Sequence, residues 1–214
     1  GLLAEAASPA KWQSEFENQI LSSARQIAEK YNCDMNHANC VERLALLIFK
    51  EMQPEHKLSH HHALLLRIAA ILHDCGRFIA LSGHHKHSKY LIENSDLFGL
   101  SQKDIKIIAL TARYHRRAEP KPTHLDYNAL LREEKMAINK LASILRVADS
   151  LDNLHTQNIA DCRLERSATE LRFLINTPGE LRSARLVLKD KTRLFEQIFG
   201  LTVTPIAHQL NAEL

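Results

Sequence analysis

The sequence lacks the features that mark membrane-spanning or secreted proteins. No apolar run approaches the roughly 20 residues that a membrane-spanning helix needs. The opening residues, GLLAEAASPAKW, have neither the basic region nor the long apolar stretch of a signal peptide. No CxxC spacing or disulfide framework links the four cysteines, Cys33, Cys40, Cys75 and Cys162. We therefore predict free thiols, a cytoplasmic location and no membrane partner.

A strong charge bias is also absent. The net charge of +3 is too small to indicate nucleic-acid binding. Basic residues gather only locally, in RYHRRAEPK at 113–121, and no reading-helix motif accompanies them. The apolar and charged fractions, 45% and 25%, are ordinary for a globular protein. The 214 residues suffice for one large domain, or for a medium domain with a small appendage.

Helical patterns dominate residues 9–152. An apolar stripe from Trp12 to Ile27 predicts a first helix that opens at Pro9. Ser101 and Asp104 form a capping-box pattern at the start of another helix. Apolar spacing predicts helices at about 35–52, 59–74, 86–94, 101–115 and 129–153.

The pattern changes after about residue 155. TELRFLIN alternates apolar and polar residues, which is typical of a half-buried strand. A helix near 183–198 and a strand LTVTPI after Gly200 follow. The sequence therefore predicts a mainly α fold, with a helical domain over residues 1–155 and a small C-terminal α+β unit over residues 156–214.

His73 and Asp74 form an adjacent pair at the end of an apolar helical run, LLLRIAAILHDCG. Imidazole and carboxylate are ligands for a divalent metal that activates water. Neighbouring helical residues project about 100° apart, so both side chains can reach one ion at a helix end. Gly76 is placed to stop that helix.

Three further candidates, His37, His115 and Asp149, lie on the apolar side of their predicted helices. A buried carboxylate must be protonated, paired or metal-bound. Each histidine alone could be a satisfied core residue, and Asp149 could pair with Arg146 or Arg113. Because four separate helices each present a donor on their inward face, a shared metal site explains them better together.

This arrangement resembles the HD superfamily of metal-dependent phosphohydrolases, whose signature places a His, a His-Asp pair and a distant Asp on helices. The resemblance implies an HD-domain helical bundle with catalytic His73, Asp74 and Asp149, in which Asp74 bridges two ions. The implied metal ligands are His37, His73, Asp74, His87, His115 and Asp149. His87 is chosen because it precedes Ser88 at a helix start, as in the family, although His84 or His85 could replace it.

The segments GHHKHSKYLIENSDLFGLS, ARYHRR and ILRVADSLDNLH resemble one branch, the C-terminal region of the Ppx/GppA exopolyphosphatases and guanosine-pentaphosphate phosphohydrolases. The likeness covers about residues 10–206. In that family an actin-like catalytic domain precedes this region, and the opening GLL resembles its end. The resemblance therefore implies an N-terminal actin-like domain in the parent protein.

Two functions follow as expectations. The first is a metal-dependent phosphohydrolase that acts on polyphosphate or (p)ppGpp-like nucleotides and holds one or two ions of Mn, Mg, Fe, Co, Ni or Zn. The alternative is a non-catalytic polyphosphate-binding module that forms a homodimer. In both, cations close to the ligands in sequence would bind phosphates: Arg77, Lys86, Lys89, Arg113 and Arg116. Each of these could equally belong to a solvated basic face.

Overall fold

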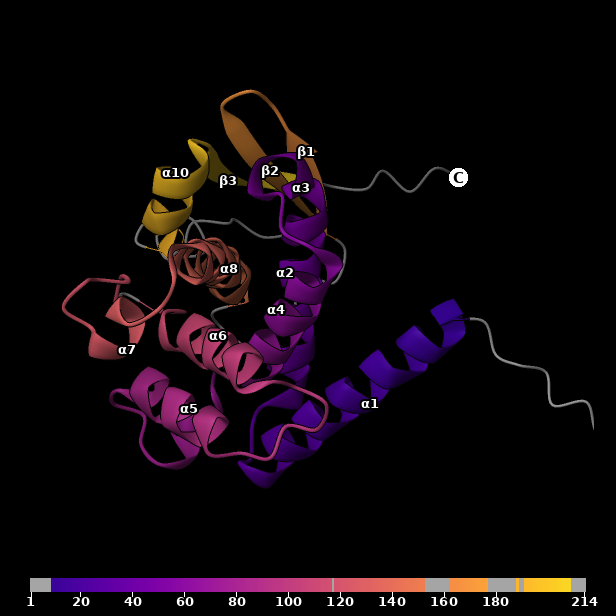
Figure 1. The fold of residues 1–214 in the computed structure, drawn as a ribbon. Helices are drawn as coiled ribbons and strands as arrows, with labels where there is room; N and C mark the ends of the chain where they lie inside the picture. The colour runs from indigo at the N-terminus through magenta and orange to yellow at the C-terminus, as the bar shows by residue number, and fades with distance from the viewer. Residues whose placement is uncertain (1–8, 117, 153–161, 177–187, 189–190, 209–214) are drawn as a thin grey trace, which may run out of the picture.

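A bundle of helices makes up most of the molecule, and a small three-stranded sheet lies at one end of it (Figure 1). The structure is a computed structural model that describes residues 9–116, 118–152, 162–176, 188 and 191–208. The predicted mainly α fold with a small C-terminal α+β unit is confirmed. The boundary expected between residues 155 and 156 lies outside the described residues.

Short connections join the helices. They are α1 (Pro9–Lys30), α2 (Met35–Glu51), α3 (Gln53–His56), α4 (His60–Leu72), the 3-10 turn η1 (Cys75–Phe78), α5 (His84–Glu93), α6 (Gln102–Arg113), α7 (Leu125–Asn128) and α8 (Arg132–Leu151). The helix expected from about residue 129 begins at Arg132, because Glu134 accepts the backbone N–H of Leu131 and caps it there. None of the described helices combines the length and apolar character needed to cross a membrane.

Capping side chains fix where α2 and α6 begin. Asp34 Oδ1 accepts the backbone N–H groups of Asn36 and His37, each at 3.1 Å. The predicted capping box of Ser101 and Asp104 is present at the start of α6. Such side chains satisfy amides that have no partner within the helix. The cap at Asp34 also sets the orientation of the first turn of α2, which carries His37.

Helix α4 is the centre of the bundle and packs against α1, α2, α6 and α8. From Ala63 to Leu72, every side chain except Arg67 is buried, as expected for a helix that is apolar on all sides. Arg67 pairs with Glu42 at 2.7 Å, and Arg25 pairs with the same carboxylate at 2.6 Å. The end of α4, and with it His73, is therefore held by packing on every side.

Helix α1 follows the predicted apolar stripe only in its second half. Ile20 is 2% exposed, whereas Trp12 and Phe16 are 65% and 45% exposed. Figure 1 shows the reason, because the N-terminal half of α1 extends beyond the other helices. Trp12 therefore stays largely exposed, and Phe16 is only partly covered, by an edge-to-face contact with Phe98.

The C-terminal unit contains β1 (Cys162–Arg166), β2 (Glu170–Asn176), α10 (Arg193–Phe199) and β3 (Thr202–His208). The sheet order is β1-β2-β3, with β1 antiparallel and β3 parallel to β2. The predicted alternation in β2 is confirmed, because Leu171, Phe173 and Ile175 are all buried. Helix α10 contacts α8, and β1 contacts α2. The unit therefore packs onto the two helices that carry His37 and Asp149.

A close backbone contact joins the turn after α4 to α5. Ser88 Oγ donates to the carbonyl of His73 at 2.6 Å and accepts the backbone N–H of Gly76 at 2.9 Å. A Cβ atom on Gly76 would lie 2.1 Å from the carbonyl oxygen of His84 and 2.3 Å from the nitrogen of Ser88. Gly76 was expected to stop a helix. Its greater importance is that it lets α5 approach the His73–Asp74 turn.

We predict that Gly76→Ala lowers the free energy of unfolding by about 3 kcal/mol or more, because backbone must move to admit the methyl group. Gly83→Ala is the matched control. Gly83 has a φ of +70° and no atom within 4 Å of an added Cβ, so Gly83→Ala should lower the free energy of unfolding by only about 1 kcal/mol. Urea unfolding measures both. Equal losses would show that the contact at Gly76 is not tight.

Candidate metal centre

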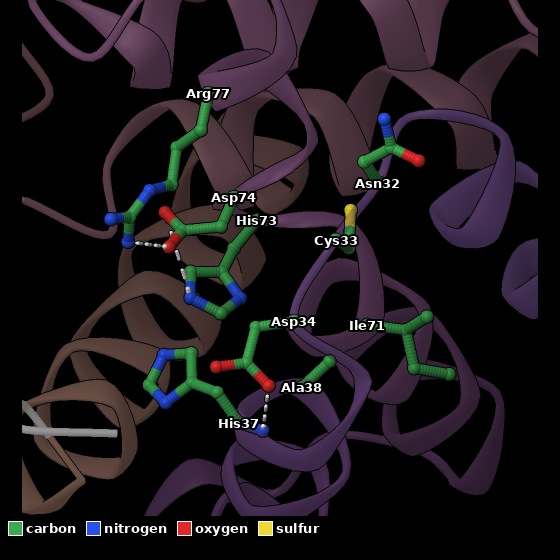
Figure 2. Close-up of a pocket in the computed structure, with 9 residues that line it drawn as sticks. All are labelled: Asn32, Cys33, Asp34, His37, Ala38, Ile71, His73, Asp74 and Arg77. Atoms are coloured by element: carbon green, nitrogen blue, oxygen red, sulfur yellow. Dashed lines mark hydrogen bonds and ion pairs between the residues drawn. The ribbon is translucent and has the colours of Figure 1, made fainter.

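Residues from five helical elements or their ends converge on one buried point. His37 lies in the first turn of α2, His73 caps the end of α4, and Asp74 follows it. His84 opens α5, His115 lies just beyond α6, and Asp149 lies in the last turn of α8. Figure 2 shows the part of the site formed by His37, His73 and Asp74, which line a cavity of about 240 Å³ together with Cys33 and Arg77.

The four histidines share one orientation. Each uses Nδ1 for a hydrogen bond away from the centre: His37 to Asp152 at 2.8 Å, His73 to the carbonyl of Ala70 at 2.7 Å, His84 to that of Leu81 at 3.0 Å and His115 to that of Ala112 at 2.6 Å. A carbonyl or ionised carboxylate can only accept, so Nδ1 carries the proton in each neutral ring. The Nε2 atoms then present lone pairs, as metal-binding histidines do.

The Nε2 atoms face the Oδ1 atoms of two carboxylates. Asp149 Oδ1 lies 3.4 Å from Nε2 of His37 and 3.6 Å from Nε2 of His73. Asp74 Oδ1 lies 3.8, 3.1 and 3.6 Å from Nε2 of His73, His84 and His115. Two groups have metal-binding geometry, one with His37, His73 and Asp74 and one with Asp74, His84 and His115. Asp74 belongs to both.

The other oxygen of each carboxylate faces a cation. Arg77 Nη1 donates to Asp74 Oδ2 at 2.9 Å, and Lys191 Nζ donates to Asp149 Oδ2. Figure 2 shows Arg77 reaching Asp74 from the side opposite His37. Each aspartate therefore turns one oxygen to the histidines and holds the other in an ion pair, which fixes the carboxylate plane.

Two observations test whether the residues fit a metal. His73 Nε2 is buried and has no hydrogen-bond partner in the part of the chain that the structure describes. Nε2 of His84 lies 3.2 Å from Nε2 of His115. Two lone pairs at that distance repel unless a proton or another cation lies between them. A divalent ion fits both places, and the mixed nitrogen and oxygen donors suit the metals named above.

Burial and charge act in opposite directions on these groups. Burial would raise the pKa of Asp74, but His73, His84 and His115 hold it well below its usual range. Burial would likewise raise the pKa of Asp149, but Lys191 and His37 hold it low. Both carboxylates are therefore ionised. Burial, with the charge of His73, lowers the pKa of His115 well below its usual value, so the imidazole of His115 is neutral.

His37 shows the opposite balance. Burial lowers its pKa, but hydrogen bonds to Asp149 and Asp152 and their charges outweigh burial and raise the pKa to about 9. Without a metal, the imidazole is therefore a cation at neutral pH and neutralises part of the buried carboxylate charge.

The structure brings together five of the predicted ligands: His37, His73, Asp74, His115 and Asp149. In place of His87, His84 completes the second group. Helix α5 begins at His84, two residues earlier than expected, so the first-turn side chain faces the centre. His87 instead places its backbone against Gly76.

The predicted phosphate-binding cations lie in different surroundings. Arg77 borders the cavity and pairs with Asp74. Lys89 pairs with Glu93 and Asp126, both at 2.7 Å, so its charge is already compensated. Lys86 is exposed, and Arg113 and Arg116 are half-buried. Burial lowers the pKa of neighbouring His85 to about 4, and Arg113, His84, Arg116 and Lys86 act in the same direction.

Two residues at the site were not assigned a role from the sequence. Asp152 holds the ring of His37, and Lys191 holds Asp149. For Asp152, the spacing of three after Asp149 on one helix gave a usable signal. For Lys191 no local pattern distinguishes it from Lys189, since its partner lies 42 residues earlier in the chain.

We predict that the metal-free protein loses stability as pH rises from about 6.5 to 9. His37 binds a proton in the folded state up to pH about 9 but in the unfolded chain only up to about 6.5. The folded state therefore binds more protons in this window, and the free energy of unfolding falls by about 1–3 kcal/mol across it.

In the variant Asp152→Asn, the free energy of unfolding should fall less over this pH range, because the substitution removes one of the two carboxylates that favour the imidazolium of His37. The exposed Asp96→Asn is the control for the change of one charge. Urea unfolding in chelator at several pH values measures both slopes. Identical slopes in the two variants would contradict the role given to Asp152.

Comparisons with known proteins agree with the resemblance seen in the sequence. Residues 21–193 match the family model described as Ppx/GppA phosphatase, domain III. Two relatives carry the name guanosine-5'-triphosphate,3'-diphosphate pyrophosphatase. The protein of Aeromonas hydrophila is 31% identical over 136 residues, which cover 63% of this chain and 27% of that protein. The protein of Pseudoalteromonas translucida is 30% identical over 120 residues, which cover 55% and 24%.

The chain thus spans about a quarter of the length of these relatives. The family model, by contrast, covers most of the chain from α1 to the start of α10. By that match the chain belongs to the Ppx/GppA phosphatase family, in which it corresponds to domain III.

Proposed function

We propose that this domain is an HD-type, metal-dependent phosphohydrolase that acts on phosphoric anhydrides such as polyphosphate or (p)ppGpp-like nucleotides. One observation carries the proposal: four buried imidazoles, each with Nδ1 held from outside, turn Nε2 toward two ionised aspartates. Nε2 of His73 is buried without a hydrogen bond within the described chain and lies 3.6 Å from Asp149 Oδ1, a position that a metal between the two atoms would fill.

The proposed ligands form two subsites. His37, His73 and Asp149 would hold one ion, and His84 and His115 a second, with Asp74 shared between them. When bound there, a divalent ion lowers the pKa of a water molecule and neutralises charge on a phosphoryl oxygen. We keep one or two ions of Mn, Mg, Fe, Co, Ni or Zn as the proposed cofactor.

The chain's own residues would position these ligands and the substrate. Asp152 and the carbonyls of Ala70 and Ala112 fix the histidine tautomers. Ion pairs with Arg77 and Lys191 keep one oxygen of each aspartate turned inward. Arg77 is exposed at the cavity, where its planar guanidinium is suited to a phosphate.

The balance of charge supports a phosphorylated substrate. Four carboxylates lie at the site, Asp34, Asp74, Asp149 and Asp152, and two cations form ion pairs there, Arg77 with Asp74 and Lys191 with Asp149. One divalent ion would therefore make the site neutral, and a second would give it a net positive charge. Such a site attracts an anion, and it favours a substrate that brings negative charge to the cavity.

The names of the relatives suggest that the phosphorylated substrate is a guanosine nucleotide and not polyphosphate. Because the chain spans about a quarter of those proteins, their activity is a proposal for it. We also keep as proposals the N-terminal actin-like domain of the parent protein and a homodimer. No specific observation favours the binding-only alternative over hydrolysis.

The first test is the metal content of the purified chain. We predict about one or two equivalents of divalent metal after incubation with Mn or Ni, with the loss of most of it in Asp74→Ala, because Asp74 belongs to both ligand groups. Asp96→Ala removes the same charge from an exposed position and should bind as wild type. Elemental analysis measures all three. A wild-type protein without metal would refute the metal-dependent proposal.

The second test is hydrolysis by the metal-loaded domain. Guanosine pentaphosphate and polyphosphate are assayed by phosphate release. We predict that Asp149→Asn, which keeps the size of the side chain but removes its charge, lowers kcat/KM about 100-fold or more, as loss of a metal ligand does. Activity that is unchanged in Asp149→Asn would show that the hydrolysis does not use this site.

A further inference from the structure

A positively charged corner lies beside the second ligand group. His85 and Lys86 come from the first turn of α5, Arg113 ends α6 and Arg116 lies in the turn that follows it. The two helices pack together. The ring centroid of His85 lies 6.0 Å from that of His84 and 6.5 Å from that of His115. The positive charges of Arg113, Arg116 and Lys86 all act on His85.

Two nitrogen atoms in this corner are buried without a hydrogen-bond partner in the described chain: His85 Nδ1 and Arg113 Nη1. Most buried polar atoms in folded proteins have a partner, and a buried guanidinium nitrogen without one is costly. Arg113 does lie over the ring of Tyr114, at 5.8 Å, but a ring face does not replace an acceptor for Nη1. The unfilled N–H of Arg113 points to an acceptor that the described residues do not provide, and the imidazole of His85 can place its one N–H beside it.

Other cations near the site have such an acceptor. Arg77 pairs with Asp74, and Lys191 pairs with Asp149. The buried Arg146 donates to the carbonyls of Tyr114 and Ala118. In contrast, none of the four residues of the charged corner forms an ion pair with a carboxylate among the described residues. The corner therefore has uncompensated positive charge next to Asp74, His84 and His115.

We propose that His85 and Arg113 form an anion subsite that binds a phosphate group of the substrate, with Lys86 and Arg116 at its rim. The guanidinium supplies a planar pair of donors, and the imidazole supplies one N–H, which together match the oxygens of a tetrahedral phosphate. This deepens the proposed function, on which it rests. It places one phosphate of the substrate beside the second ligand group, next to His84 and His115.

The test uses metal-free protein, so that its result does not depend on metal binding or turnover. Tripolyphosphate and GTP are each titrated into the protein by calorimetry, after a chelator has been added and removed. We expect Arg113→Met to weaken the binding of both ligands about tenfold or more, as the loss of a charge-assisted hydrogen bond does. Arg113→Lys keeps the charge but not the planar fork, and should fall between wild type and Arg113→Met.

Arg132→Met is the matched control, because it removes the same charge from the exposed start of α8. That position is roughly 25 Å along the helix from Asp149, at 1.5 Å per residue, and binding should change less than twofold. If GTP and tripolyphosphate lose affinity alike, the subsite recognises the phosphate chain alone. If GTP binds every variant more tightly than tripolyphosphate does, and still loses affinity in Arg113→Met, the guanine base makes additional contacts outside the subsite.

A second measurement needs no variant and guards against misfolding of Arg113→Met. In wild-type protein labelled with ¹⁵N, tripolyphosphate should shift the imidazole signals of His85 and the guanidinium signals of Arg113 in one saturable step. No binding to metal-free wild type, or equal losses in Arg113→Met and Arg132→Met, would overturn the subsite. Either result would leave the metal content and the hydrolysis of the loaded protein to decide the proposed function separately.

Discussion

The outward hydrogen bonds of four buried imidazoles are the constraint on which the site depends. Each Nδ1 donates to an acceptor that cannot donate, so each Nε2 turns inward, where it offers a lone pair to a metal when the ring is neutral. For His73, His84 and His115 the acceptor is a carbonyl three residues earlier, near the end or the beginning of a helix. Local backbone geometry therefore sets the direction of these three rings, and helix packing brings them together.

The contact between Gly76 and Ser88 brings the ligands of the second group together. It joins the His73–Asp74 turn to the first two turns of α5 through backbone atoms. His84, one turn before Ser88 in α5, is thereby brought to 3.1 Å from Asp74. The position of Asp74 between two ligand groups thus depends on a small residue and a hydroxyl, neither of which touches the centre.

The sequence allowed prediction of the parts that follow from helical periodicity. His37, His115 and Asp149 lie on apolar faces, and apolar faces meet in the core, so their convergence followed from spacing. The choice between His84 and His87 depended on where α5 begins, and helix boundaries are set by tertiary contacts such as those of Gly76. Lys191 could not be found, because a pair that spans 42 residues and two structural units leaves no local pattern.

The ion pair of Lys191 and Asp149 also changes how the small C-terminal unit is understood. Asp149 lies in the helical bundle, whereas Lys191 lies in the segment that leads into α10. A buried carboxylate that lost this partner would keep only His37 and His73 to offset its desolvation. Because α10 also packs on α8, the unit holds both the backbone and the charge of the residue that faces the histidines. The sheet and its helix are therefore part of the support of the site rather than an appendage to it.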